Sequence, residues 1–145
     1  MSRSNHFHPK KRPIAVVLWL RLIRVFQKIG RKSQEPLERI GLTGPQFDVL
    51  MNVHTTPGLT QQMLADRLHV TKGNVSQLIE KLAKKELLVR QRQGRTSCLF
   101  ATKKGSVLIE EMLPEHDQFI VDQFESLTEE EQRQLLFLLR KLYKG

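Results

Sequence analysis

The sequence predicts a mainly α-helical protein with one small β-hairpin, and three observations lead to this fold class. Apolar residues recur at helical spacing along most of the 145 residues. Threonine stands before several of these segments, where its side-chain oxygen can cap a helix. One stretch, near residues 89–100, changes to an alternating pattern. We expect a flexible basic arm at residues 1–12, followed by a single domain at residues 13–145.

The first helix is predicted to run from Pro13, a residue suited to a first helical turn, to about Arg31. A short separate piece is expected near residues 35–40. Thr43 and the glutamine three residues later have the spacing of a capping box, which opens a second helix. Pro57 and the following glycine end this helix. Its inward face is expected to hold Phe47, Leu50 and Met51.

Two short helices follow in the middle of the chain. Thr60 is expected to cap the first, which runs to about His69, and Thr71 is expected to cap the second. The apolar residues expected to face inward are Met63, Leu64 and Leu68 in the first helix and Val75, Leu78, Ile79 and Leu82 in the second. A tight joint between two such helices indicates a helix-turn-helix.

The alternating stretch predicts a β-hairpin with strands at about residues 89–92 and 96–100 and a turn at Gln93 and Gly94. Thr102 then caps a long helix, which Pro114 is expected to kink or interrupt. A second capping box, at Thr128, opens the last helix. This helix is apolar on more than one side, which favours contact with a second subunit.

The formal net charge of +9 is distributed unevenly along the chain. Residues 1–32 carry nine Lys or Arg and no Asp or Glu, and residues 33–66 carry one against four. Residues 67–104 carry ten against two, and residues 105–145 carry four against nine. Two basic blocks beside an acidic tail point to a polyanionic partner.

The helix after Thr71 carries residues suited to reading DNA. At about 100° per residue, the side opposite its apolar stripe is centred on Gly73, Gln77 and Lys84. An amide can read adenine and a lysine can neutralise phosphate, although an ordinary solvated helix face would also be polar. The hairpin decides the interpretation because it carries three arginines, and Arg95 lies beside its turn, where it can reach a minor groove or a phosphate. The residues predicted to bind DNA are Thr60, Gln61, Gln62, Thr71, Lys72, Gly73, Asn74, Ser76, Gln77, Lys81, Lys84, Arg90, Arg92, Arg95 and Thr96.

The sequence offers no sign of an enzyme. It contains no phosphate-binding glycine loop, no Gly-x-Ser-x-Gly motif and no paired metal ligands, so no catalytic residue, cofactor or metal is expected. His6 and His8 have no carboxylate or cysteine nearby and are not expected to hold a metal. The lone Cys98 is expected to be an inert thiol, with an oxidant sensor as the alternative. Because no apolar run approaches a membrane span and no signal peptide is present, we expect a cytoplasmic location.

The order and spacing of these segments resemble the MarR family of winged-helix regulators. Leu42–Leu50 is similar to the second helix of the family, and Leu59–Gln62 with Leu68–Leu82 resembles its DNA-reading unit. Leu87–Arg90 and Ala101–Gly105 are similar to the boundaries of the family's wing. The resemblance covers nearly the whole chain.

This resemblance implies a winged helix-turn-helix at residues 42–104, with dimerisation helices at residues 13–41 and 105–145. It also implies a homodimer that represses nearby genes at a pseudo-palindromic operator and is released by a small ligand or an oxidant. Half-sites about 10 base pairs apart are expected for a two-fold protein. Trp19 and Phe26 are the candidate residues for a ligand pocket.

The wing departs from the family pattern. Only Gln93, Gly94 and Arg95 follow Arg92, so the wing tip is short and lacks the family's acidic residues. The resemblance matches Arg95 to the wing arginine of the family. A non-specific architectural DNA-binding protein is the alternative function, motivated by the basic arm and the high positive charge.

Overall fold

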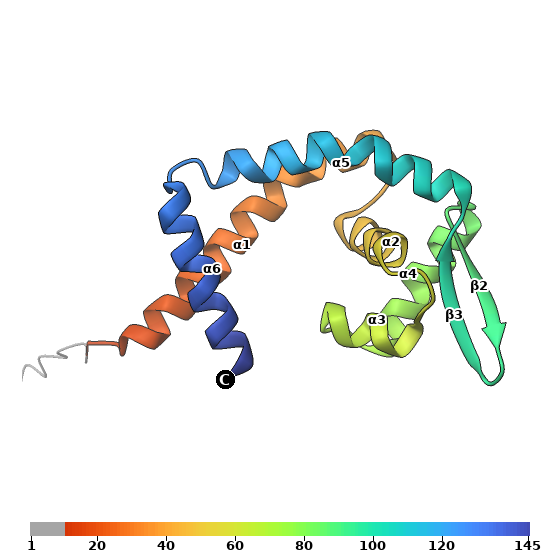
Figure 1. Cartoon of the computed structure of the whole chain (residues 1–145), viewed down its shortest axis with the longest axis horizontal. Coiled ribbons are helices and arrows are strands. Elements are labelled where there is room, and N and C mark those ends of the chain that lie inside the picture. The colour runs from red at the N-terminus through yellow and green to blue at the C-terminus, as the bar shows by residue number, and fades with distance from the viewer. Residues whose placement is uncertain (1–10) are drawn as a thin grey trace, which may run out of the picture. The chain divides into compact units, whose positions relative to one another are not determined.

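The computed structural model describes residues 11–145 and confirms the predicted fold class (Figure 1). The described residues form six helices and a small three-stranded antiparallel sheet. They divide into an N-terminal unit that ends at Lys32 and a larger unit, Ser33–Gly145, and each unit is described by itself. Most of the predicted basic arm, with His6 and His8, lies outside the described residues.

The N-terminal unit holds the first part of helix α1, which spans Ile14–Arg39. The predicted end at Arg31 is wrong, because the helix continues through Pro36, and the separate piece near residues 35–40 is its last turns. Pro36 removes one backbone donor from the last turns of the helix. Leu37 is buried in the core of the larger unit and fixes these turns.

Helix α2, Gly44–Thr55, begins with the predicted capping box. The Gln46 N–H donates to Thr43 Oγ1 at 3.3 Å, and the Thr43 N–H donates to Gln46 Oε1 at 3.1 Å. Phe47 and Leu50 are buried as predicted, whereas Met51 is only partly buried and packs against the core.

Helices α3, Gln61–Leu68, and α4, Lys72–Lys84, form the helix-turn-helix. Thr60 and Thr71 cap them as predicted, each accepting a backbone N–H three residues on. His69, in the joint, adopts a left-handed conformation with φ 51°. Met63 is 48% exposed, so its predicted inward position is wrong, and Leu64 and Ala65 fill the inward face of α3 instead.

The sheet contains one strand that the sequence does not predict. Strand β1, Leu59–Thr60, pairs with β3, Thr96–Ala101, which in turn pairs with β2, Leu88–Gln93. Two residues give too short a pattern to reveal a strand before its partner is known. The hairpin itself is confirmed, but its turn consists of Gly94 and Arg95 rather than Gln93 and Gly94. Gly94 has φ +64°, which suits a glycine at the first position of a two-residue hairpin turn.

Helices α5, Lys103–Gln123, and α6, Glu129–Lys144, complete the chain. Thr102 and Thr128 cap them as predicted, and α5 continues through Pro114 without interruption. Buried side chains of α2, α3, α4, the sheet and α5 form one core, which includes Leu50, Leu64, Ile79, Leu99 and Ile109. No helix within residues 11–145 is both long enough and apolar enough to cross a membrane.

Candidate nucleic-acid interface

Helix α4 presents the predicted reading face to solvent, and we call it the reader helix. Val75, Ile79 and Leu82 are fully buried, so the opposite side of the helix points outward. Gly73 and Gln77 lie on this exposed side. A Cβ added at Gly73 would meet no atom within 4 Å, so the protein fold itself does not require glycine there. The absence of a side chain leaves room for an approaching ligand.

Helix α3 supports the start of the reader helix. Gln61 Nε2 donates to the Lys72 carbonyl at 3.3 Å, and this bond joins the first turns of the two helices. The Thr60 and Thr71 hydroxyl oxygens accept backbone N–H groups at 3.1 and 3.2 Å. Each hydroxyl keeps its own proton, which can donate to a phosphate oxygen. Gln62 lies next to them on the surface and donates to Asp66.

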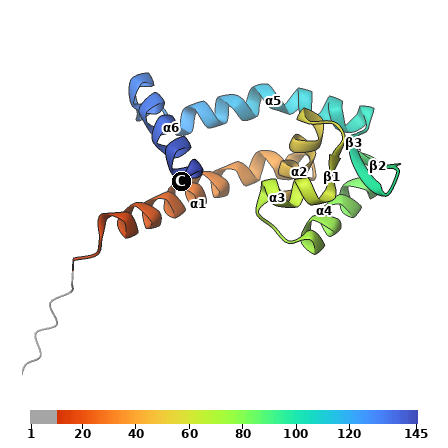
Figure 2. The ribbon, with the colours of Figure 1, turned by 60° about the horizontal axis from the view of Figure 1, so that its bottom comes forward.

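The β2–β3 hairpin, which we call the wing, extends beside the reader helix (Figure 2). Directly opposite residues of an antiparallel pair share a face, so Arg90, paired with Leu99, and Arg92, paired with Ser97, lie on one face. This is the face that buries Leu88 against the helices. Arg95 lies in the turn itself. No carboxylate within the described part of the chain forms an ion pair with any of the three arginines.

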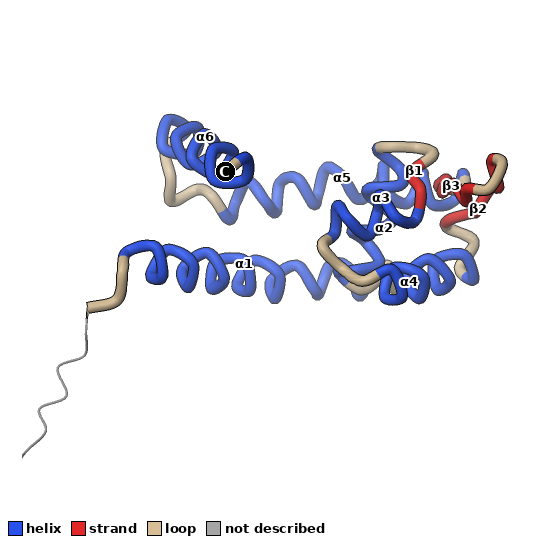
Figure 3. The backbone as a smooth tube through the Cα atoms, turned by 90° about the horizontal axis from the view of Figure 1, so that it is seen from below, coloured by secondary structure: helices blue, strands red, loops and turns tan. Residues whose placement is uncertain are grey.

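The predicted DNA-binding residues all reach the surface of the larger unit. Those exposed are Gln62, Thr71, Lys72, Gly73, Asn74, Gln77, Lys81, Lys84, Arg90, Arg92, Arg95 and Thr96, and those partly exposed are Thr60, Gln61 and Ser76. Figure 3 shows the two helices and the wing that carry them gathered at one end of α5. The structure thus brings the predicted set onto neighbouring elements.

The end of the reader helix is held by a dense set of bonds that the sequence does not reveal. Glu86 has φ +60°, and its N–H and that of Leu87 donate to the Ala83 and Leu82 carbonyls, as in a Schellman motif. Thr102 Oγ1 donates to the Glu86 carbonyl at 2.6 Å. A Cβ at Gly105 would collide with the Leu87 carbonyl, so only glycine lets α5 approach here.

Cys98 is buried on the wing and donates weakly to Gln93 Oε1 at 3.7 Å. It pairs with Gln91 of β2 and Thr60 of β1. Because a buried thiol is poorly accessible to oxidants, this environment favours the inert interpretation.

A cavity of about 100 Å³ lies between the last turns of α1 and helix α5. Its lining consists of Pro36, Leu37, Met112 and Phe119 together with the polar Ser33, Glu115 and His116. The predicted pocket residues Trp19 and Phe26 do not line it and are exposed on α1.

His116 connects this cavity to α2. Its ring packs against Phe47 with centroids 5.0 Å apart, and its buried Nδ1 has no hydrogen-bond partner among the described residues. Asp117 Oδ1 lies 3.7 Å from that nitrogen. Asp48 reaches the surface, yet the atoms packed around it raise the pKa of its carboxyl through desolvation, while the nearby His116 lowers it to a lesser extent.

Comparison with known proteins places this geometry in a family. A model of the MarR family matches residues 40–96. An HTH-type transcriptional regulator of Bacillus cereus is 38% identical over 132 residues, which span 90% of both chains. The chain belongs to the MarR family. It is therefore a transcriptional regulator and not an enzyme, as the sequence predicts.

Further regulators are similar to the chain in sequence or in structure. The HTH-type transcriptional repressor MdtR of Bacillus subtilis is 29% identical over 126 residues, covering 85% of this chain and 81% of that protein. A mutant MarR of E. coli in complex with operator DNA is 25% identical, with a TM-score of 0.78 over 88% of this chain and 95% of its own. Bordetella bronchiseptica BpsR, whose DNA binding is regulated by 6-hydroxynicotinic acid, is also 25% identical. Its TM-score is 0.79, over 87% of this chain and 98% of its own.

Proposed function

We propose that this MarR-family protein is a homodimeric, sequence-specific DNA-binding repressor that a small ligand releases from its operator. The observation that carries the proposal is the exposed face of the reader helix, which places Gly73 and Gln77 beside a wing with three arginines that no carboxylate within the described residues neutralises. A groove-reading helix supplies base contacts, and the flanking cations supply the sequence-independent part of the affinity. Residues 13–145 act as one MarR-like domain in this proposal, in the cytoplasm.

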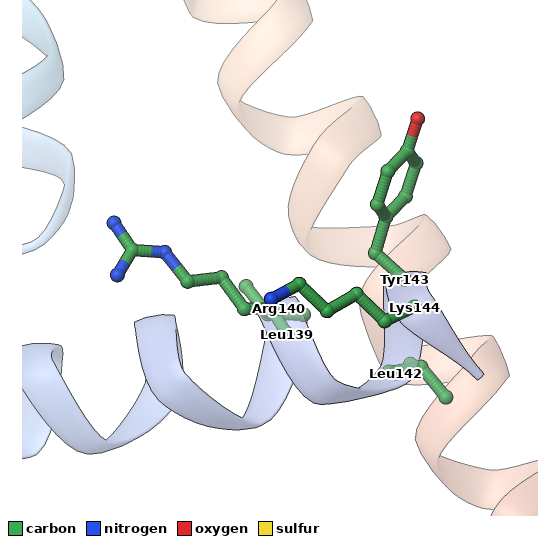
Figure 4. A pocket seen from close by; sticks show the side chains of 5 residues that line it. All are labelled: Leu139, Arg140, Leu142, Tyr143 and Lys144. Carbon is green, nitrogen blue, oxygen red and sulfur yellow. The ribbon is translucent and has the colours of Figure 1, made fainter.

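The proposed dimer accounts for the apolar surface of α6. Within the described residues, no side chain of this helix is buried, although Leu138, Leu142 and Tyr143 are large and apolar. Figure 4 shows a surface depression along its last turns, where Leu139, Leu142 and Tyr143 alternate with Arg140 and Lys144. An exposed apolar surface of this kind is typical of a subunit interface.

The proposed ligand site is the cavity beside His116. A volume of about 100 Å³ is suited to a molecule no larger than a single ring. BpsR, which responds to an aromatic acid, supports control by a small molecule. No Lys or Arg lines the cavity here and Glu115 does, so a neutral ligand fits it better than an anion.

A competition experiment tests the proposal against the alternative of an architectural protein. The full chain is bound to a labelled duplex from upstream of its own gene at fixed salt, and unlabelled random DNA is added. A specific repressor retains the labelled duplex against a random-DNA excess of about a thousandfold or more. Loss of the labelled duplex at an equal mass of random DNA supports the architectural function instead.

A further inference from the structure

The ten Lys and Arg residues of the basic block at residues 67–104 fall into two groups. Three donate hydrogen bonds to neutral oxygen atoms of the protein, and we call them the anchored cations: Arg67, Lys85 and Lys104. The side chains of the other seven form no hydrogen bond or ion pair with another described residue, and we call them the free cations: Lys72, Lys81, Lys84, Arg90, Arg92, Arg95 and Lys103.

The anchored lysines meet at the carbonyl end of the reader helix. Lys85, the residue after the last turn, donates from Nζ to the Gly41 carbonyl in the turn between α1 and α2. Lys104, in the first turn of α5, donates from Nζ to the Lys85 carbonyl at 3.2 Å. A cation near a helix C-terminus also interacts favourably with the helix dipole.

The positions of the two neighbouring lysines at the end of the reader helix differ accordingly. At about 100° per residue, Lys84 lies at the centre of the exposed face with Gly73 and Gln77, whereas Lys85 lies about 100° away, toward Gly41. The Lys84 side chain has no partner among the described residues, and the Lys85 side chain has one. Two adjacent lysines therefore differ in their surroundings: one side chain points to solvent and the other binds the protein.

We propose that Lys85 and Lys104 are positioning residues, which fix the end of the reader helix to the α1–α2 turn and to the start of α5, while the free cations neutralise DNA phosphates. This inference rests on the proposed DNA-binding function. It predicts that only part of the positive charge in the basic block contributes to the salt dependence of binding. Net charge alone would assign the same contribution to all ten cations.

The salt dependence of affinity separates the two groups, since each phosphate contact contributes about 0.9 to the slope of log K against log salt concentration. Lys84→Gln and Lys85→Gln are a matched pair, because each removes one charge, from the last residue of the reader helix and from the residue that follows it. We expect Lys84→Gln to make the slope of a dimer shallower by about 1.8. Lys85→Gln should leave the slope unchanged and weaken binding equally at every salt concentration.

Unfolding in urea provides the second readout, which does not depend on DNA. Lys85→Gln should lower the urea midpoint, Lys85→Arg should restore it by supplying a donor, and Lys84→Gln should leave it unchanged. Equal loss of slope in the two glutamine variants, or an unchanged midpoint in Lys85→Gln, would overturn the assignment of Lys85. If the unmodified chain binds no duplex, the proposed function fails, while the urea readout still decides whether Lys85 anchors the helix.

Discussion

Gly73 occupies the centre of the exposed face of the reader helix, and its missing side chain has no structural explanation within the protein. A helical glycine with open space around it costs stability relative to alanine. Gln77 at the centre of the same face and Asn74 at its edge would come within reach of base edges only if the helix backbone approaches the DNA closely. The glycine is thus better explained by contact with DNA than by folding.

Gly73→Ala should therefore have opposite effects on folding and on binding. We expect the free energy of unfolding to rise by about 0.5 kcal/mol, because alanine favours the helix. The affinity for operator DNA should fall by about tenfold, which corresponds to about 1.4 kcal/mol. Urea denaturation and fluorescence anisotropy measure the two effects. Gly30→Ala in α1, where a Cβ also meets open space, is the matched control and should leave DNA binding unchanged.

Gln77 and Arg95 should affect DNA binding in different ways. Gln77→Ala removes an amide that reads a base edge, so it should reduce discrimination at one operator position by about 1–3 kcal/mol. Arg95→Ala, at the turn of the wing, should weaken binding to all duplexes and make the salt dependence shallower. Titrations against an operator and its single-base variants compare the two. Identical profiles for both variants would contradict the division between helix and wing.

At the scale of single elements, the end of the reader helix depends on an unfavourable backbone conformation. Glu86 takes the left-handed position of a Schellman motif, where glycine is usual, whereas Gly41 fills the equivalent position after α1 with φ +73°. The bond from Thr102 to the Glu86 carbonyl and the close approach at Gly105 hold this conformation in place.

Glu86→Gly should accordingly raise the free energy of unfolding by about 1 kcal/mol, since glycine enters the left-handed region without steric cost. Gly41→Ala is the reverse test, because its Cβ would meet no atom and only backbone strain would change. Gly41→Ala should lower the free energy of unfolding by a similar amount. Urea denaturation of both variants checks the pair, and a destabilised Glu86→Gly would show that the glutamate side chain contributes more than its backbone costs.

Local sequence signals predicted helix starts well, because a capping threonine and the residue three positions later define a start by themselves. They predicted helix ends less well. The sequence predicted that α1 ends near Arg31, whereas the helix ends at Arg39. Burial of Leu37 outweighs the loss of one backbone donor at Pro36. Strand β1 and the exposure of Met63 depend on distant partners, which a local pattern does not contain.

The exposed face of the reader helix was predictable from local sequence, since it is the complement of a regular apolar stripe. The cavity beside His116 and the anchoring of Lys85 were not. Both depend on side chains from two or more elements, and the sequence gives no indication that Lys85 and Gly41 are neighbours.

For the whole molecule, the proposed dimer depends on the apolar surface of α6. Leu142→Glu introduces a charge into that surface and should convert the dimer to a monomer, which sedimentation equilibrium detects. Gln134→Glu adds the same charge on a more polar side of the helix and should leave the dimer intact. Loss of the dimer should also weaken operator binding, because a monomer engages one half-site. A Leu142→Glu protein that remains dimeric would place the interface elsewhere.

Selection of bound duplexes from a random pool tests most directly the central claim that this chain reads DNA sequence as a symmetric dimer. The account predicts an enriched pseudo-palindrome whose half-sites lie about one helical turn, roughly 10 base pairs, apart. Recovery of duplexes without any shared motif, at an affinity equal to that of the starting pool, would contradict it.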